Sequence, residues 1–217
     1  MQFYPSDTLL STFTPLLPVD DTGIVAHQAP DFFALWEALE REAGAECDIP
    51  YWGAVWPGAR LLARHLLHNR EIVAGKTVLD FGSGGAVAAI AATLAGAQRV
   101  IANDIDPVAH HIARKNGGAN GAVMEYNHSN LLTEPEVEKC DVVLVADMFY
   151  ERSTADALLR FLRERRARGA EVLIADACRP FAPKTGMTAL ATDRLAVNLA
   201  LEGRAERQVT LYRLSGG

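Results

Sequence analysis

The sequence predicts an α/β fold: a doubly wound, mostly parallel seven-stranded sheet with an antiparallel C-terminal hairpin and an N-terminal helical extension. Short apolar runs rich in β-branched residues alternate with helical patterns from Lys76 onward. Such runs are typical of strands buried on both faces of a parallel sheet, and the helices between them serve as crossovers. Two strand-like runs at the C-terminus have only a glycine-containing turn between them, which predicts a hairpin.

The chain of 217 residues has the length of one domain. Residues 1–30 carry four prolines and little periodicity, so we expect an extended arm there. Residues 31–217 then form a single domain, with helices in 31–70 and the sheet core in 75–217. Asp31 and Gly44 bracket the first helical pattern as caps, and Pro57 opens the second.

The sheet core divides into five strand runs and three crossover helices. The predicted strands are "KTVLDFG", "RVIAND", "VMEYN", "CDVVLVAD" and "AEVLIAD", and the predicted helices are "AVAAIAATLAG", "PVAHHIARKNGGAN" and "RSTADALLRFLRERRARG". The hairpin consists of "ATDRLAVNLALE" and "ERQVTLYRL". The first of these two runs is also compatible with a helix, because Ala and Leu dominate it.

Composition limits the classes of partner. A net charge of −6 argues against nucleic acid, because phosphate contacts need clustered Lys and Arg. The sequence shows no signal-peptide pattern and no apolar run long enough to span a membrane, so we expect a cytoplasmic protein without membrane association. We also expect a monomer. Three widely spaced cysteines fit a reducing compartment. The histidine pairs lack a completing cysteine or carboxylate cluster, so no metal site is expected.

A glycine turn follows the first core strand in "VLDFGSGGAVAAIAA". Gly82, Ser83 and Gly84 allow a ligand to approach the backbone and leave the first amides of the next helix free to donate. A dinucleotide fingerprint would need glycine at position 87, which is Val87. Asp80 before the turn disfavours a pyrophosphate and favours a cationic nucleoside such as S-adenosylmethionine. The alternative role for Asp80 is a helix cap.

Further cofactor contacts are expected at the ends of the next two strands. Asp104 in "ANDIDP" is placed to accept both ribose hydroxyls, and Ile105 offers an apolar surface to adenine. Asn130 in "YNHSNLL" is the candidate for the adenine amino edge. For Asp104 and Asn130 the alternative is a turn-forming residue after a strand.

Together "DFGSGGA", "NDID" and "DMFY" resemble a class I, seven-β-strand S-adenosylmethionine-dependent methyltransferase with a Rossmann-like fold. Residues 147–150 match the D-x-x-Y motif of the family 16 protein-lysine methyltransferases. With "PYWGAVWPG", the segments resemble the branch that methylates lysines of the electron transfer flavoprotein β subunit. The resemblance runs from about residue 30 to the C-terminus and implies S-adenosylmethionine as cofactor and a protein substrate. Ala86 replaces the family's third glycine.

The motif after the fourth strand suggests how a lysine is handled. Asp147 is expected to capture the ammonium at the pocket mouth, and Tyr150 to orient the neutral amine as catalytic and substrate-binding residue. Aromatic faces attract ammonium groups, so Trp52 is assigned to the substrate channel and Trp56 to the cofactor side. The alternatives are a capping and a packing role for the motif, and a core position for the tryptophans.

Three readings of the function remain open at this level. The first is a protein-lysine methyltransferase acting on the electron transfer flavoprotein β subunit. The second is a methyltransferase for another protein, such as a ribosomal protein, or for a small amine. The third is a non-catalytic nucleoside-binding scaffold.

Overall fold

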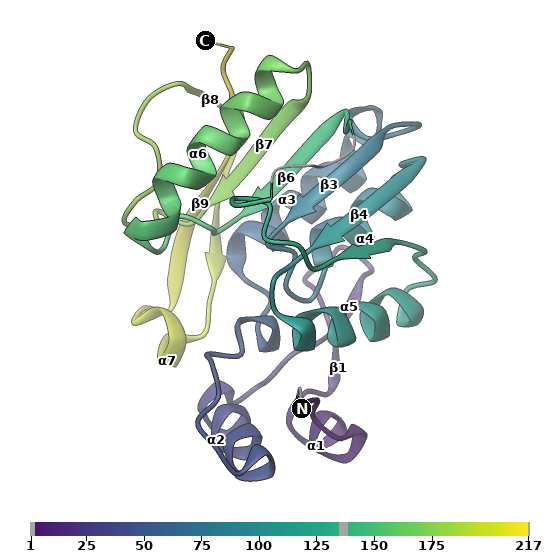
Figure 1. The fold of residues 1–217 in the computed structure, drawn as a ribbon, viewed down its shortest axis with the longest axis vertical. Coiled ribbons are helices and arrows are strands. Elements are labelled where there is room, and N and C mark those ends of the chain that lie inside the picture. The colour runs from purple at the N-terminus through teal and green to yellow at the C-terminus, as the bar shows by residue number, and fades with distance from the viewer. Residues whose placement is uncertain (1–2, 135–138, 217) are drawn as a thin grey trace.

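The computed structural model describes residues 3–134 and 139–216. Its centre is a seven-stranded sheet in the order β5-β4-β3-β6-β7-β9-β8 (Figure 1). The five strands from β5 to β7 run parallel, and β9 pairs antiparallel with both β7 and β8. The doubly wound sheet and the antiparallel C-terminal hairpin predicted from the sequence are confirmed.

The described helices and strands follow one another closely. The helices are α1 (Asp7–Phe13), α2 (Phe32–Ala43), α3 (Pro57–His68), α4 (Val87–Leu94), α5 (Pro107–Ala119), α6 (Arg152–Ala167) and α7 (Leu199–Glu202), with 3-10 turns η1 (Tyr51–Gly53) and η2 (Arg70–Ile72). The strands are β1 (Leu16–Pro18), β2 (Val25–His27), β3 (Thr77–Phe81), β4 (Arg99–Asn103), β5 (Glu125–Asn127), β6 (Val142–Ala146), β7 (Glu171–Asp176), β8 (Met187–Ala196) and β9 (Glu206–Leu214).

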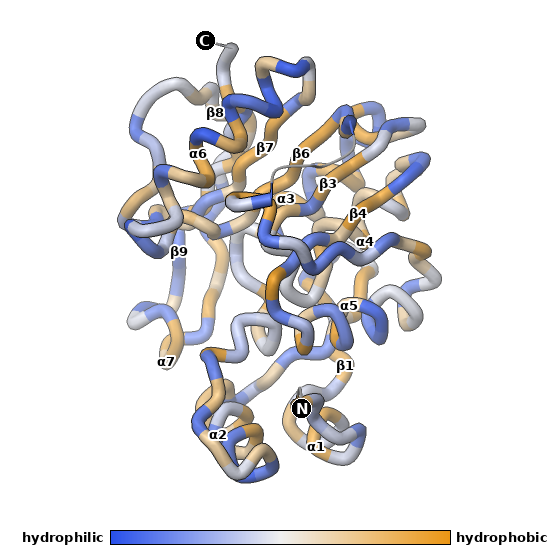
Figure 2. Tube along the Cα trace, viewed as in Figure 1, coloured by the Kyte–Doolittle hydropathy of each residue, from blue (hydrophilic) through white to orange (hydrophobic). Residues whose placement is uncertain are grey.

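Two hydrophobic layers cover the sheet because side chains alternate along each strand. Val78 and Leu144 point toward the layer that contains α3 and α4, whereas Leu79 and Val143 point toward α6. Figure 2 shows the resulting apolar character of β3, β6 and β7 in the middle of the molecule. Burial on both faces explains why these strands are continuous apolar runs.

The helical extension forms as its sequence predicts. The side chain of Asp31 accepts a hydrogen bond from the Ala34 amide at 3.0 Å, and Gly44 ends α2 in the left-handed conformation. Pro57 occupies the first turn of α3. The apolar face of α2 packs with α1, with the side chain of Trp52 and with residues of α5.

The first thirty residues differ from the extended arm that we expected. They contain α1 and a small antiparallel hairpin of β1 and β2. Ser6 caps α1 by accepting from the Leu9 amide, and Leu9 and Leu10 are buried against the helical extension. The prolines lie outside α1, so they do not prevent this helix. The boundary at residue 30 stays a prediction.

The C-terminal run that was compatible with either strand or helix contains both. Strand β8 extends from Met187 to Ala196, and the short helix α7 follows after Asn198, whose side chain accepts from the Ala200 amide. Helix α7 therefore sits at the tip of the hairpin, at the edge where the parallel strands end (Figure 1).

Candidate functional site

The glycine turn connects β3 to α4 at the carboxyl ends of the parallel strands. Gly82 and Gly84 have φ values of 66° and 50°, which favour glycine. A Cβ at Gly82 would overlap the sulfur of Met148, so this turn lies against the loop after β6. The Ser83 amide donates to the Asn103 carbonyl at 2.9 Å, which ties the turn to the end of β4.

Asp80 lies beneath this turn and is 2% exposed. Its Oδ2 accepts from the Ala89 amide at 3.0 Å, in the first turn of α4, so the carboxylate serves as the cap that the sequence left open. Burial raises the pKa of Asp80 to about 7, and the charge of Asp104 adds to the rise. A cation bound at the turn would favour the ionised carboxylate.

Asp104 closes the turn from the end of β4. Its Oδ2 accepts from the Gly84 amide at 2.7 Å and its Oδ1 from the Asp106 amide at 3.0 Å. Burial raises the pKa of Asp104. Ile105 is 67% exposed and leaves an apolar surface beside this carboxylate. The bond from the Asp106 amide is the turn-forming role that the sequence left as the alternative for Asp104, and the cofactor contacts of both residues stay predictions.

Asn130 is exposed, and its Oδ1 accepts from the Leu132 amide at 3.1 Å. This contact is the turn-forming role that the sequence left as the alternative. The nearby Asn103, which sequence reasoning missed, is buried and donates to the carbonyls of Asn127 and Ser129. Asn103 therefore holds the loop after β5 against β4.

A second buried asparagine supports the glycine turn from α5. Asn116 is fully buried, donates to the Gly85 carbonyl at 2.8 Å and accepts from the His27 amide at 2.8 Å. One side chain thus connects the glycine turn to β2. Nothing in the sequence pattern distinguishes this asparagine from others on helices, so reasoning from sequence missed it.

Asp147 is buried rather than open to solvent, and its expected contact with a substrate ammonium stays a prediction. The residue is 6% exposed, with a φ of 54°. Its Oδ2 accepts from the Gly58 amide at 2.6 Å, and its Oδ1 accepts from the Ala177 amide at 3.0 Å and from Arg179 Nε at 2.9 Å. These donors come from protein groups, so the carboxylate is already satisfied without a substrate ammonium.

Three aromatic rings form a wall beside this buried carboxylate: Tyr51, Trp56 and Tyr150, hereafter the aromatic wall. The Tyr51 ring centroid lies 5.2 Å from that of Tyr150 and 6.0 Å from that of Trp56. Trp56 Nε1 donates to the Tyr51 carbonyl at 2.8 Å, which fixes the indole. Tyr51 and Tyr150 are each 40% exposed, so the wall faces solvent.

Tyr150 stays protonated at neutral pH. Burial raises its pKa to about 12, and Tyr51, Glu151 and Asp104 add to the rise. A neutral phenol can both donate and accept a hydrogen bond, so Tyr150 can orient an uncharged amine.

Trp52 is a core residue, which corrects its assignment to a substrate channel. It is 3% exposed and packs with Leu35, Leu39 and Ile112 between α2 and α5. Only its backbone approaches the glycine turn, at Gly84 and Gly85. The indole of Trp52 covers the apolar face of α2, whereas the indole of Trp56 lies nearer the surface, beside the Tyr51 carbonyl and Arg179.

Arg179, in the loop after β7, is the charged residue that the sequence analysis missed. It pairs with Asp147 and with Glu202 of α7, and its guanidinium carbon lies 5.4 Å from the Trp56 ring centroid. A cation shortly after the carboxyl end of a parallel strand was the available signal, because such positions line the ligand edge of the sheet.

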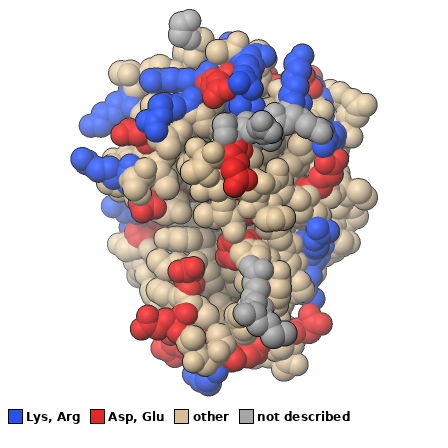
Figure 3. All heavy atoms as spheres, in the orientation of Figure 1, with Lys and Arg blue, Asp and Glu red and all other residues tan. Residues whose placement is uncertain are grey.

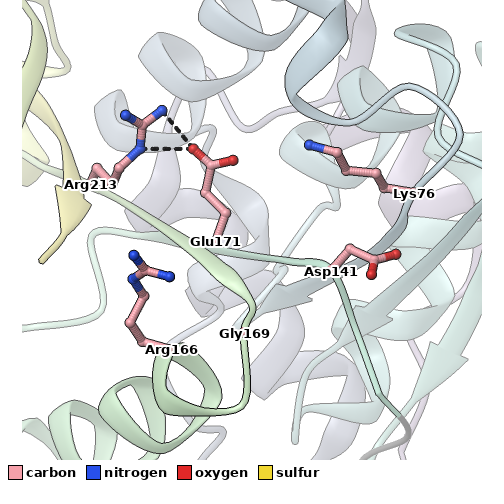
Figure 4. Close-up of a pocket in the computed structure, with 6 residues that line it drawn as sticks. All are labelled: Lys76, Asp141, Arg166, Gly169, Glu171 and Arg213. Carbon is pink, nitrogen blue, oxygen red and sulfur yellow. Dashed lines mark hydrogen bonds and ion pairs between the residues drawn. The ribbon is translucent and has the colours of Figure 1, made fainter. Parts of the chain in front are cut away.

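A depression of about 630 Å³ lies at the opposite edge of the sheet (Figure 4). Residues near the amino ends of β3, β6 and β7 line it, and they include the Glu171–Arg213 ion pair. In Figure 3, Lys and Arg gather at this end of the molecule. The glycine turn and the aromatic wall do not contribute to it, so it is separate from the candidate site.

The described residues contain neither a metal-ligand cluster nor a membrane-spanning helix. Residues 3–134 and 139–216 contain no group of three His, Cys, Asp or Glu side chains arranged to hold a metal ion. None of the helices in these ranges has both the length and the apolar character needed to cross a membrane.

Comparison with solved structures identifies the fold. A ribosomal protein L11 methylase of Lactobacillus delbrueckii superposes with a TM-score of 0.50, 22% identity and coverage of 72% of this chain and 77% of that chain. A 16S rRNA methyltransferase of T. thermophilus, solved with AdoMet and guanosine, superposes with a TM-score of 0.55, 19% identity and coverage of 76% and 44%. The fold is that of a class I methyltransferase.

Sequence comparison gives narrower similarities. The family model "Ribosomal protein L11 methyltransferase (PrmA)" matches residues 65–154. A Danio rerio protein named electron transfer flavoprotein beta subunit lysine methyltransferase is 41% identical over 128 residues, which is 58% of this chain and 50% of that protein. The resemblance found from the motifs is confirmed, and the chain spans about half the length of this methyltransferase relative.

The contacts of Asp147 predict a large effect of Asp147→Asn on stability. In either orientation, the amide NH₂ of asparagine would face a protein donor, and Arg179 would lose its charged partner. Disruption of a buried ion pair costs about 3 to 5 kcal/mol. We expect the free energy of unfolding, measured by urea denaturation, to fall by about this amount.

Glu171→Gln is the matched control, because it breaks the more exposed Glu171–Arg213 pair of the same sheet. An exposed pair contributes up to about 1 kcal/mol. Equal losses in the two variants would contradict the structural role given to Asp147.

Proposed function

We propose that the chain is an S-adenosylmethionine-dependent protein-lysine N-methyltransferase whose substrate is the electron transfer flavoprotein β subunit. The observation that carries the proposal is the position of an acidic glycine turn and an aromatic wall at one edge of the sheet. The name of the relative that is 41% identical supports the choice of lysine and of this substrate. We also infer that the protein acts in the cytoplasm as a monomer.

The carboxylates and the open backbone of the glycine turn fit S-adenosylmethionine. Asp80 is buried and Asp104 is partly buried, and both carboxylates have raised pKa values, so both gain from a cationic ligand. A Cβ at Gly84 would meet only the Trp52 backbone, at 3.9 Å, so glycine keeps this side of the turn open to a ligand. We assign the ribose hydroxyls to Asp104, the adenine face to Ile105, and the adenine amino edge to Asn130 in the loop after β5.

When bound, S-adenosylmethionine would supply a methyl group from its sulfonium: a nucleophile would bond to the methyl carbon in line while the carbon–sulfur bond breaks and the neutral thioether leaves. The protein must therefore present an amine with a free lone pair. A lysine with a pKa of about 10.4 loses its proton at pH 7 at a cost of roughly 4.6 kcal/mol. Burial of the side chain against Tyr51, Trp56 and Tyr150 lowers this cost, because a low dielectric disfavours the ammonium.

Tyr150 then orients the neutral amine through its hydroxyl, and Trp56 and Tyr51 hold the alkyl chain. Aromatic faces also attract the methylammonium product, at about 0.5 to 2 kcal/mol each. The paired Asp147 holds the loop that carries Tyr150 and no longer needs to bind the substrate itself. An unpaired Asp147 would bind the lysine ammonium but would also oppose the loss of its proton. With Asp147 paired, the aromatic wall holds the side chain and no free carboxylate opposes deprotonation.

A second substrate, a ribosomal protein, is favoured by one observation. The family model of the ribosomal protein L11 methyltransferases matches residues 65–154, which include the glycine turn and Asp147. The segment before residue 65 contains most of the aromatic wall and lies outside that match. We therefore rank the electron transfer flavoprotein first.

The assay that tests the function uses the purified chain, radiolabelled S-adenosylmethionine, and recombinant electron transfer flavoprotein and ribosomal protein L11 in separate reactions. We expect label on a lysine of the flavoprotein β subunit, mapped by mass spectrometry. Label on L11 alone would replace the substrate, and no label on any protein in a cell extract would overturn the methyltransferase proposal.

Asp104→Ala tests the cofactor assignment. Loss of a hydrogen bond to a charged group costs about 1.5 to 3 kcal/mol, so affinity for S-adenosylmethionine should fall about 10- to 100-fold in calorimetry. Asn130→Ala is the comparison, because Asn130 Oδ1 already closes a turn. We expect a smaller loss there, and unchanged affinity in Asp104→Ala would exclude the ribose assignment.

The raised pKa of Asp80 predicts that cofactor binding depends on pH. Because this pKa is about 7, the carboxylate is mostly ionised at pH 8 and mostly protonated at pH 6. A cation binds the ionised form, so affinity should fall about tenfold from pH 8 to pH 6. Calorimetry at both pH values measures this, and Asp80→Asn should remove most of the dependence. A dependence that persists in this variant would show that another group is responsible.

A further inference from the structure

A buried network of four charged side chains lies at the carboxyl ends of β6 and β7. Arg179 donates from Nε to Asp147 at 2.9 Å and from its two terminal nitrogens to Glu202 at 2.8 and 3.1 Å. Arg207 donates to Glu202 at 2.8 Å. The exposed fractions of these side chains lie between 3% and 18%. Two carboxylates and two guanidinium groups balance, so the network has no net charge.

This network lies directly behind the aromatic wall. The Arg179 guanidinium carbon is 5.4 Å from the centroid of the Trp56 ring. Asp147 accepts from Gly58, two residues after Trp56, and begins the loop that ends at Tyr150. The net charge of the network therefore affects the pKa of an acceptor amine bound at the aromatic wall.

Further charged groups of both signs lie at this edge. The cations are Arg152, whose guanidinium carbon is 5.5 Å from the Phe181 ring centroid, and Arg60, which pairs with Asp20 and donates to the Ala196 carbonyl. Asp176 at the end of β7 accepts from the Arg179 amide at 2.8 Å, and burial raises the pKa of Asp176 to about 6. Glu151 and Asp104 act on Tyr150 from the α6 and β4 sides. Without Arg179, Asp147 and Glu202 would add to this negative set, and an acceptor amine would be held as ammonium.

We propose that Arg179 is a positioning and charge-balancing residue: it neutralises Asp147 so that the acceptor amine at the aromatic wall can lose its proton. The inference rests on the proposed methyl transfer to lysine. Glu202 fixes the guanidinium from α7, so the C-terminal hairpin takes part in the same role.

The test is the pH profile of kcat, measured with saturating S-adenosylmethionine and electron transfer flavoprotein for the wild type, Arg179→Gln and Arg179→Lys. The profile of kcat reports groups in the bound complex, which includes the acceptor amine. In Arg179→Gln the rising limb should shift up by about one pH unit or more, with about tenfold loss of rate at pH 7 that shrinks at high pH. Arg179→Lys keeps the charge and should keep the midpoint, at a lower plateau.

Glu202→Gln provides a test of opposite sign. It removes a negative charge from the same network, so the rising limb should shift down. The double variant Asp147→Asn/Arg179→Gln is neutral again and should return the midpoint toward that of the wild type. Glu202→Gln decides the matter if Arg179→Gln does not fold. Arg213→Gln removes an arginine from the opposite edge of the sheet and should leave the midpoint unchanged.

A loss of kcat by the same factor at every pH in Arg179→Gln would overturn the inference and leave Arg179 with a purely structural role. Shifts of the same sign in Arg179→Gln and Glu202→Gln would also overturn it. These outcomes require an active wild type, so they are distinct from failure of the proposed function, in which the wild type itself transfers no methyl group to protein.

Discussion

The carboxylate of Asp147 is the contact on which the ligand edge of this protein depends. It joins the end of β6 to the first turn of α3 through Gly58, to the end of β7 through Ala177, and to the C-terminal hairpin through Arg179. Position 58 must be glycine, because a Cβ there would lie 2.7 Å from both Asp147 Oδ2 and the Ala175 carbonyl oxygen. A single buried side chain thus restricts the sequence of several segments that are distant along the chain.

Backbone strain gathers at the same edge. Among the described residues other than glycine, four have positive φ values. Three of them, Ala86, Asp147 and Cys178, have φ between 54° and 63° and follow strands of the parallel sheet, whereas Asp20, with φ of 47°, lies between β1 and β2. Such conformations cost about 1 to 3 kcal/mol each and persist where surrounding contacts determine them. The hydrogen bonds of Asp147 are contacts of this kind.

The sequence was sufficient to predict the sheet, its crossovers and the caps of α2, because these follow from local periodicity and from residues such as Asp31 and Gly44. It also placed Asp80, Asp104 and Ile105 at one edge, because parallel strands end together. It could not distinguish Trp52 from Trp56, since burial depends on what α5 and α2 present to each ring. The partnership of Asp147 and Arg179 joins residues 32 positions apart, and no periodicity indicates it.

The fully buried Asn116 has a consequence for how this protein can be shortened or tagged. Its amide bonds the glycine turn with one atom and the β2 backbone with another, so the N-terminal hairpin is part of the scaffold that holds the glycine turn. Removal of the first thirty residues would leave the Asn116 oxygen without its partner beneath the turn. A fusion is better placed at the C-terminal end, because β9 ends there on the side of the sheet away from α5 (Figure 1).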